Sequence, residues 1–179
     1  MKKVCAFLLC AVFIFLLTAC STTNNGSSAV KQDNSNTVQA TQTQAKAEYK
    51  VGDTWTVEGQ WEVTVTGISE TSERNEFADK KPAAVYIINF TWKNIGYKDA
   101  AGLLTGLFIN MDDSVVDSTG QMGYSYPGNI TDYPKETPVG ATCNGQVCIG
   151  VDNKGLPIKL NVTQYDSNSN QQSAVFILE

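Results

Sequence analysis

The chain has 179 residues, with 13 Lys and Arg against 18 Asp and Glu, and a formal net charge of −5 at pH 7. It contains no histidine, the usual general base near neutral pH and the commonest metal ligand, which excludes triad hydrolases and most zinc enzymes. The acidic balance is also a poor match for nucleic acid, whose phosphates are bound by Lys and Arg clusters. We therefore expect no nucleic-acid partner, no metal and no cofactor.

The first 19 residues have the pattern of a secretory signal peptide. Lys2-Lys3 precedes an apolar run from Val4 to Leu17, and Leu17-Thr18-Ala19-Cys20 ends it. This tetrapeptide resembles the lipobox of bacterial lipoproteins. The resemblance implies cleavage before Cys20 and a diacylglyceryl group on its thiol, which would hold the protein on the cell membrane, facing the extracellular side.

Two alternatives to lipid anchoring stay open. One is an uncleaved transmembrane helix, although the apolar stretch from Val4 to Ala19 has 16 residues, fewer than the roughly 20 that a membrane-spanning helix needs. Ordinary cleavage with full secretion is the other alternative. Cleavage also removes Lys2-Lys3 and leaves a net charge of −7, which anionic lipid would repel, so the lipid on Cys20 is the expected membrane contact.

Residues 20–48 are predicted to comprise the lipidated cysteine and a flexible linker. Of the 27 residues from Ser21 to Ala47, 18 are Ser, Thr, Asn, Gln or Gly, and none is aromatic. Such a segment cannot bury enough apolar area to offset the entropy cost of ordering it. Residues 49–179 are then left as one domain, which is large enough to bury a core.

From residue 49 onward, short stretches alternate apolar and polar residues. Period-two alternation is typical of a half-buried β-strand, and no stretch here shows a long helical period. The inward-facing sets lie in 55–57, 61–66, 84–93, 107–111, 147–151, 158–162 and 174–178, and they include Trp55, Trp61, Tyr86, Ile88, Phe90 and Trp92. Seven or more short strands with turns between them predict an all-β fold, an antiparallel β-sandwich.

Several motifs then follow one another in a set order. They are Val51-Gly52-Asp53-Thr54, Trp61-Glu62-Val63-Thr64-Val65, Trp92-Lys93-Asn94-Ile95-Gly96, Pro138-Val139-Gly140 and Ala174-Val175-Phe176. This order resembles the extracellular immunoglobulin-like domain of many bacterial lipoproteins, a family of unknown function whose structural relatives include a secreted mycobacterial immunogenic antigen. The resemblance covers most of 49–179 and implies an immunoglobulin-like sandwich outside the cell, without catalytic residues. The chain departs from the family pattern in the segment 112–140 and in its cysteine pair.

Two cysteines, Cys143 and Cys148, remain once the signal peptide is removed and Cys20 is lipidated. If 143–151 is one strand, residues five apart lie about 16 Å apart on opposite faces, beyond the ~7 Å that a disulfide spans. If Asn144-Gly145 forms a hairpin turn, Cys143 meets Cys148 and a structural disulfide can form. The sequence leaves both arrangements open.

Asp112, Asp113 and Asp117 are close enough in sequence to suggest a calcium site, because Ca²⁺ binds carboxylate oxygens. The spacing lacks the glycine and the distal glutamate of an EF-hand loop. We therefore expect a solvated hairpin here and no metal site.

Tyr124, Tyr126 and Tyr133 gather in the long segment between Gly120 and Gly140. Long ordered loops are often functional, and exposed tyrosines give a large contact area at a small entropy cost. These tyrosines are the candidate partner-binding residues. The alternative is that their rings pack under the edge of the sandwich as a lid.

The sequence thus predicts a non-enzymatic, lipid-anchored, extracytoplasmic immunoglobulin-like module that binds a protein or a cell-envelope component. The alternative is an inhibitor or accessory subunit of an envelope enzyme or transporter, which differs only in its partner. An enzyme that uses Ser and Lys or paired carboxylates would need spacings that the chain does not show.

Overall fold

The computed structural model describes residues 47–179, so the predicted signal peptide, Cys20 and nearly all of the predicted linker lie outside the described residues. Within 47–179 the chain forms β-strands and no helix, and therefore no helix that could cross a membrane. The strands are β1 (Ala47–Lys50), β2 (Thr54–Val57), β3 (Trp61–Thr71), β4 (Ala84–Asn94), β5 (Val115–Val116), β6 (Tyr124–Ser125), β7 (Thr142–Val151), β8 (Ile158–Tyr165) and β9 (Gln171–Leu178).

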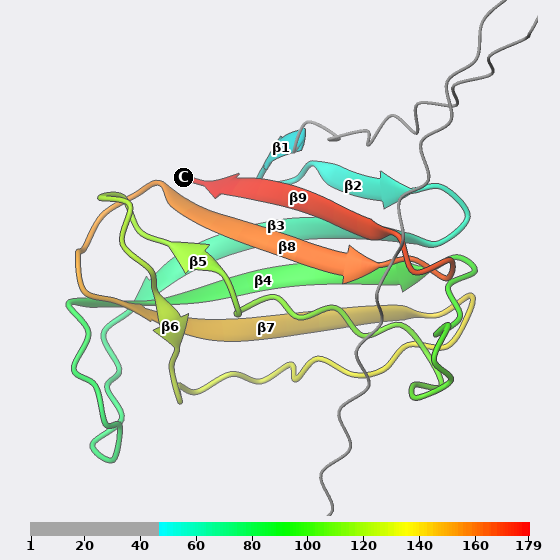
Figure 1. Ribbon diagram of the computed structural model, residues 1–179. Coiled ribbons are helices and arrows are strands. Elements are labelled where there is room, and N and C mark those ends of the chain that lie inside the picture. Colours follow the sequence, from blue (N-terminus) through cyan, green and yellow to red (C-terminus); the bar gives the residue numbers. More distant parts are fainter. Residues whose placement is uncertain (1–46) are drawn as a thin grey trace, which may run out of the picture. The chain divides into compact units, whose positions relative to one another are not determined.

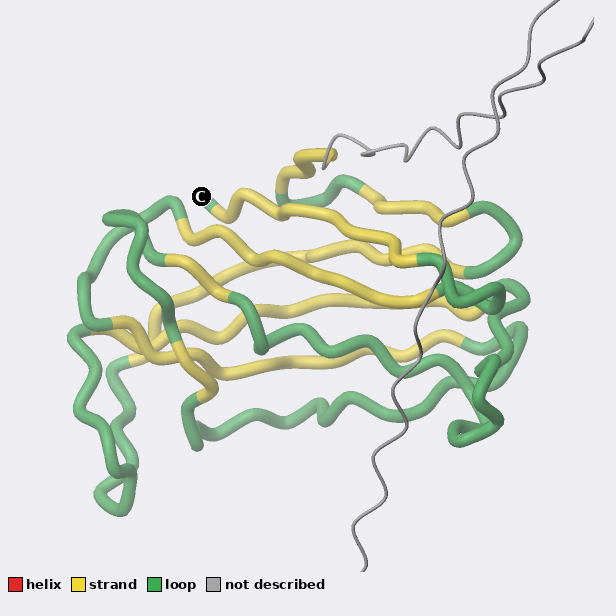
Figure 2. Tube along the Cα trace, in the orientation of Figure 1, coloured by secondary structure: helices red, strands yellow, loops and turns green. Residues whose placement is uncertain are grey.

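The strands form two sheets that face each other (Figure 1, Figure 2). Sheet A has the order β1-β9-β8-β5, and sheet B has the order β2-β3-β4-β7-β6. Neighbouring strands are antiparallel except β1 and β9, which pair in parallel with Ala47 opposite Ala174. The predicted antiparallel β-sandwich is confirmed.

The core lies between the inner faces of the two sheets. On β4 the predicted inward side chains, from Tyr86 to Trp92, are each at most 4 % exposed. They belong to the same buried cluster as Leu160 of β8 and Phe176 of β9. Burial of apolar area contributes about 25 cal/mol per Å², so the inward side chains of β4 contribute to the free energy that holds the two sheets together.

The three tryptophans lie in this core, as predicted. Trp61 packs edge-on against Trp55, with ring centroids 5.6 Å apart, and Phe90 stacks on Trp92 at 5.2 Å. Nε1 of Trp92 donates a hydrogen bond of 2.8 Å to Oγ1 of Thr137. This bond ties the segment between β6 and β7 to the centre of sheet B.

The segment 107–111 differs from the sequence prediction. Leu107, Ile109 and Met111 are buried as expected, but the segment forms only an isolated bridge. Leu107 and Thr137 exchange two backbone hydrogen bonds, of 2.8 and 2.9 Å. The segment therefore covers an open side of the sandwich instead of joining a sheet.

The short strands were not predicted. β5 and β6 have two residues each, too few to show a period of two. β1 begins at Ala47, two residues before the predicted start of the domain.

Candidate binding surface

The outer face of sheet B changes from polar to apolar along its strands. One cross-strand row is Thr54, Thr64, Thr91 and Asn144, on β2, β3, β4 and β7. Further along, the outward side chains of β4 and β7 include Val85, Ile87 and Cys148, which form a second, smaller apolar cluster with Tyr126. The segment that follows β6 covers this apolar half, while the polar half stays uncovered.

Tyr126 is the central residue of the segment that covers the apolar half of sheet B. Its ring is 5 % exposed and packs with Val85 and Cys148. Its backbone N–H donates to the carbonyl of Cys148 at 2.8 Å, and its phenolic oxygen accepts a 2.8 Å bond from the backbone N–H of Asn75. Tyr126 therefore has the buried position that the lid alternative describes.

Tyr124 is half-buried on β6. The Nζ of Lys80 lies 4.1 Å from the centre of its ring, a cation–π contact. Its hydroxyl donates to Oδ1 of Asp152 at 3.3 Å. Burial, and then the neighbouring Asp152 carboxylate, raise the pKa of Tyr124. One face of this ring is thus already occupied by Lys80.

Tyr133 is the exposed member of the predicted trio, at 62 %. Gln146 of β7 fixes the chain just before it: its Oε1 accepts from the backbone N–H of Thr131 at 2.8 Å, and its Nε2 donates to Oδ1 of Asn89 at 2.8 Å. The backbone N–H of Gln146 also donates to the carbonyl of Asp132 at 2.7 Å. Hydrogen bonds therefore hold the backbone just before Tyr133, and the Tyr133 side chain is exposed to solvent.

A groove of about 580 Å³ lies beside Tyr133. It is lined by Asn75, residues 108–112 and 125–130, Tyr133, Pro134 and residues 146–148. Its volume is within the range of about 300–1,000 Å³ that small-molecule sites occupy, and its lining combines apolar side chains with a comparable share of polar ones. Tyr126 and Tyr133, two of the three predicted tyrosines, meet at this groove.

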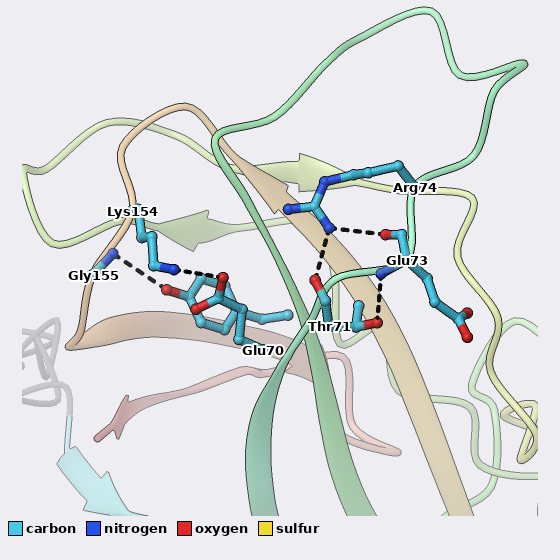
Figure 3. Close-up of polar contacts among 7 residues, drawn as sticks. Glu70, Thr71, Glu73, Arg74, Lys154 and Gly155 are labelled. Carbon is cyan, nitrogen blue, oxygen red and sulfur yellow. Dashed lines mark hydrogen bonds and ion pairs between the residues drawn. The ribbon is translucent and has the colours of Figure 1, made fainter.

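The loop 72–83, which joins β3 to β4, borders the groove on one side and projects from the end of the sandwich (Figure 1). Figure 3 shows how its root is held: Nη1 of Arg74 donates to the carbonyls of Thr71 (2.7 Å) and Glu73 (2.8 Å). Beside it, Lys154 and Glu70 form an ion pair of 2.8 Å. This pair is well exposed, and exposed pairs contribute little to stability.

The two cysteines lie on one strand. Cys143 and Cys148 are both on β7 with free thiols, Cys143 in the core between the sheets and Cys148 in the outer cluster. The strand alternative is therefore the one found, and the hairpin turn on which the disulfide depended is not formed. Burial raises the pKa of the Cys148 thiol, so this thiol is a poor nucleophile.

Gly145 explains why Asn144-Gly145 is not a turn. These residues pair with Thr91 and Phe90 in the middle of the β4–β7 ladder. A Cβ atom on Gly145 would lie 2.6 Å from ring atoms of Phe90. The glycine is needed for close approach of an aromatic ring, and its neighbour Asn144 faces outward.

Asp117 organises a turn. Its Oδ1 accepts from the backbone N–H groups of Thr119 and Gln121, each at 2.9 Å, and its Oδ2 accepts from Nδ2 of Asn153 at 2.9 Å. Burial alone would raise the pKa of Asp117, but these hydrogen bonds outweigh it and lower the pKa to about 2. Within 47–179, no group of three or more His, Cys, Asp and Glu side chains is placed to hold a metal ion.

The fold and this surface define an antiparallel β-sandwich with a groove beside its larger sheet. No protein-family model matches the sequence, and no curated protein matches it. The chain is similar to solved structures that include two bacterial proteins. The yjhA protein from Bacillus subtilis is 17 % identical, with 73 % of this chain and 99 % of that chain covered and a TM-score of 0.48. MPT63, a secreted protein from Mycobacterium tuberculosis, is 13 % identical, with 76 % and 98 % covered and a TM-score of 0.48.

The β-sandwich that the family resemblance implied is present. Membership of the lipoprotein family stays a prediction.

One exposed aromatic was missed from the sequence. Phe77, at the tip of the loop 72–83, is 91 % exposed. The signal was a lone aromatic residue within the charged stretch from Glu73 to Lys81.

Proposed function

We propose that this protein is a non-enzymatic, lipid-anchored, extracytoplasmic module that binds a protein or cell-envelope component through the groove beside Tyr133. The proposal that this groove binds a partner rests on its volume of about 580 Å³ and on the exposed Tyr133 that lines it. Tyrosine is one of the residue types that most often dominate the binding energy of a protein interface.

The proposed location rests on the sequence Leu17-Thr18-Ala19-Cys20, which lies outside the described residues. A Cys20→Ser variant is expected to lose lipid labelling and to accumulate as the unprocessed precursor, because the acceptor thiol is gone. Metabolic labelling with a fatty-acid analogue and gel mobility measure both effects. A variant that is still labelled and processed to the usual size would overturn lipid anchoring.

Two observations support a non-enzymatic role. The whole chain contains no histidine. Asp117 and Asp166 are buried acidic residues, and hydrogen bonds from neighbouring backbone and amide groups occupy both oxygens of each carboxylate. Neither carboxylate is placed to act as a general base on a bound molecule.

Proximity labelling on intact cells tests the binding surface. The full chain, fused to a labelling peroxidase, is compared with Tyr133→Ala and with Tyr165→Ala. Tyr165 is a matched control because it is 55 % exposed and lies outside the groove lining. We expect Tyr133→Ala alone to reduce labelling of a defined neighbour, whose identity distinguishes an envelope component from an enzyme or transporter subunit. Equal labelling in all three proteins would overturn the groove as the binding surface.

A further inference from the structure

Phe77 is the most exposed large apolar side chain among residues 47–179, at 91 %. It occupies the third position of a four-residue turn, Asn75 to Ala78, closed by a 3.2 Å bond from the N–H of Ala78 to the carbonyl of Asn75. An aromatic ring in this position has its whole apolar surface available for contact.

The first residue of the turn is clamped from three directions. The backbone N–H of Asn75 donates to the hydroxyl of Tyr126 at 2.8 Å, and its Nδ2 donates to the carbonyl of Pro127 at 2.9 Å. Its Oδ1 accepts a 2.9 Å bond from the N–H of Phe77 itself. The last residue, Ala78, packs against the outer apolar cluster.

The rest of the loop is also fastened to its surroundings. Nδ2 of Asn129 donates to Oε2 of Glu73 at 2.7 Å, Arg74 bonds to backbone carbonyls at the loop root (Figure 3), and Lys80 lies over the ring of Tyr124. The ends of the turn are therefore fixed while its middle projects. Such pre-organisation lowers the entropy cost of forming a contact.

The surface around Phe77 is recessed on both sides. One cleft of about 270 Å³ is lined by Phe77 and by Tyr126 to Asn129, and a second of about 270 Å³ is lined by Phe77 and by Tyr124 to Pro127. The first cleft shares Asn75 and residues 126–129 with the groove beside Tyr133. The turn and the groove are thus parts of one continuous surface.

The charge pattern decides what kind of partner fits. Three acidic and three basic residues flank Phe77 in the loop sequence: Glu73, Arg74, Glu76, Asp79, Lys80 and Lys81. Their charges cancel, and Glu76 and Asp79 next to Phe77 would be repelled by anionic lipid or phosphate. An exposed aromatic side chain on a loop that carries charges of both signs is typical of a protein–protein contact.

We propose that Phe77 is the anchor of this surface and inserts into an apolar pocket of a partner protein whose rim carries charges of both signs. The inference rests on the proposed function, since the partner is the protein that the module binds. It adds the class of partner and the side chain that enters it.

In-cell photo-crosslinking tests the proposal. A photoreactive phenylalanine analogue is placed at position 77 or, as a control, at position 103 of the full-length chain in its own cells. Leu103 is 84 % exposed and lies on a different loop, outside the two clefts and the groove. We expect one protein adduct of defined mass from position 77 and none from position 103.

The protein identified in the adduct is then purified, and its affinity for the full chain in detergent is measured. We expect Phe77→Ala to weaken binding about 10- to 100-fold, the range set by losing a buried aromatic side chain, and Leu103→Ala to leave it unchanged. Equal weakening by both variants would overturn the proposal. So would the absence of an adduct at position 77, an equal adduct at position 103, or an adduct only with lipid or a second copy.

The two proposals fail separately. If Tyr133→Ala reduces proximity labelling but position 77 gives no protein adduct, the groove stands and the Phe77 anchor is wrong. If neither experiment responds, the proposed binding function itself is wrong.

Discussion

Gly128 lies so close to Cys148 that a Cβ atom on Gly128 would overlap the Sγ atom of the cysteine. This contact fixes the segment after β6 against the outer face of β7. It also defines the floor of the groove, because both residues line it.

Gly128→Ala is expected to destabilise the protein by about 1–3 kcal/mol, the usual cost of overpacking. In the double variant Gly128→Ala/Cys148→Ala the overlapping sulfur is gone, so the cost of the alanine should fall. Urea unfolding of the four proteins in this double-mutant cycle measures the coupling. Simple additivity of the two single effects would show that the contact is not formed.

Tyr126→Phe removes the hydroxyl that accepts from the N–H of Asn75. We expect a loss of about 1 kcal/mol in the free energy of unfolding and faster hydrogen exchange of the loop 72–83, since its clamp is weakened. Exchange mass spectrometry measures the second effect directly. Tyr133→Phe is the control and should change neither quantity, because the structure shows no hydrogen bond to the Tyr133 hydroxyl. Unchanged exchange in Tyr126→Phe would contradict the role of the clamp.

The lowered pKa of Asp117 makes the free energy of unfolding depend on pH. Its pKa is about 2 in the folded protein against a usual value of 3.8, so the unfolded state binds the proton more tightly. The stabilisation is present above about pH 4 and is lost as the pH falls toward 2. We expect Asp117→Asn to lower Tm at pH 7 and the Tm difference from the parent protein to shrink between pH 4 and pH 2. Asp113→Asn, which removes an exposed carboxylate, is the control, and a constant difference for Asp117→Asn would contradict the assignment.

The two thiols are expected to stay reduced. Mass spectrometry without reductant should show no loss of two hydrogens at Cys143 and Cys148, which lie on opposite faces of β7. An alkylating reagent should modify both slowly in the folded protein, because both are buried, and rapidly in denaturant. A mass two hydrogens lower in the native protein would contradict the register of β7.

The long strands were predictable from local pattern. β4 was expected over 84–93 and is found over Ala84–Asn94, because burial of one face selects apolar residues at every second position. Three features depend on residues far away in the sequence and could not be predicted from the local sequence pattern. They are the two-residue β5, which exists because Val115 meets Leu160, the segment 107–111, whose backbone bonds to Thr137, and Gly145, whose place is set by Phe90.

The candidate site was predictable only as a segment. Tyr126 and Tyr133 are the same residue type in the same stretch, yet one is 5 % exposed and the other 62 %. The difference in exposure comes from tertiary contacts. Tyr126 packs on the apolar half of sheet B, whereas Tyr133 follows Thr131, which Gln146 of β7 holds by a hydrogen bond. Phe77 was missed because its presentation depends on Asn75 contacting residues 126 and 127, about fifty positions away.

The parallel pairing of β1 with β9 has a mechanical consequence. A tensile load that enters the chain at Ala47 passes first across the pairs from Ala47–Ala174 to Lys50–Ile177, and so into sheet A. Phe77 and Tyr133 are attached to sheet B. A pull on the N-terminal side would therefore separate the four-residue β1 from β9 before it loaded the part of sheet B that carries Phe77 and Tyr133.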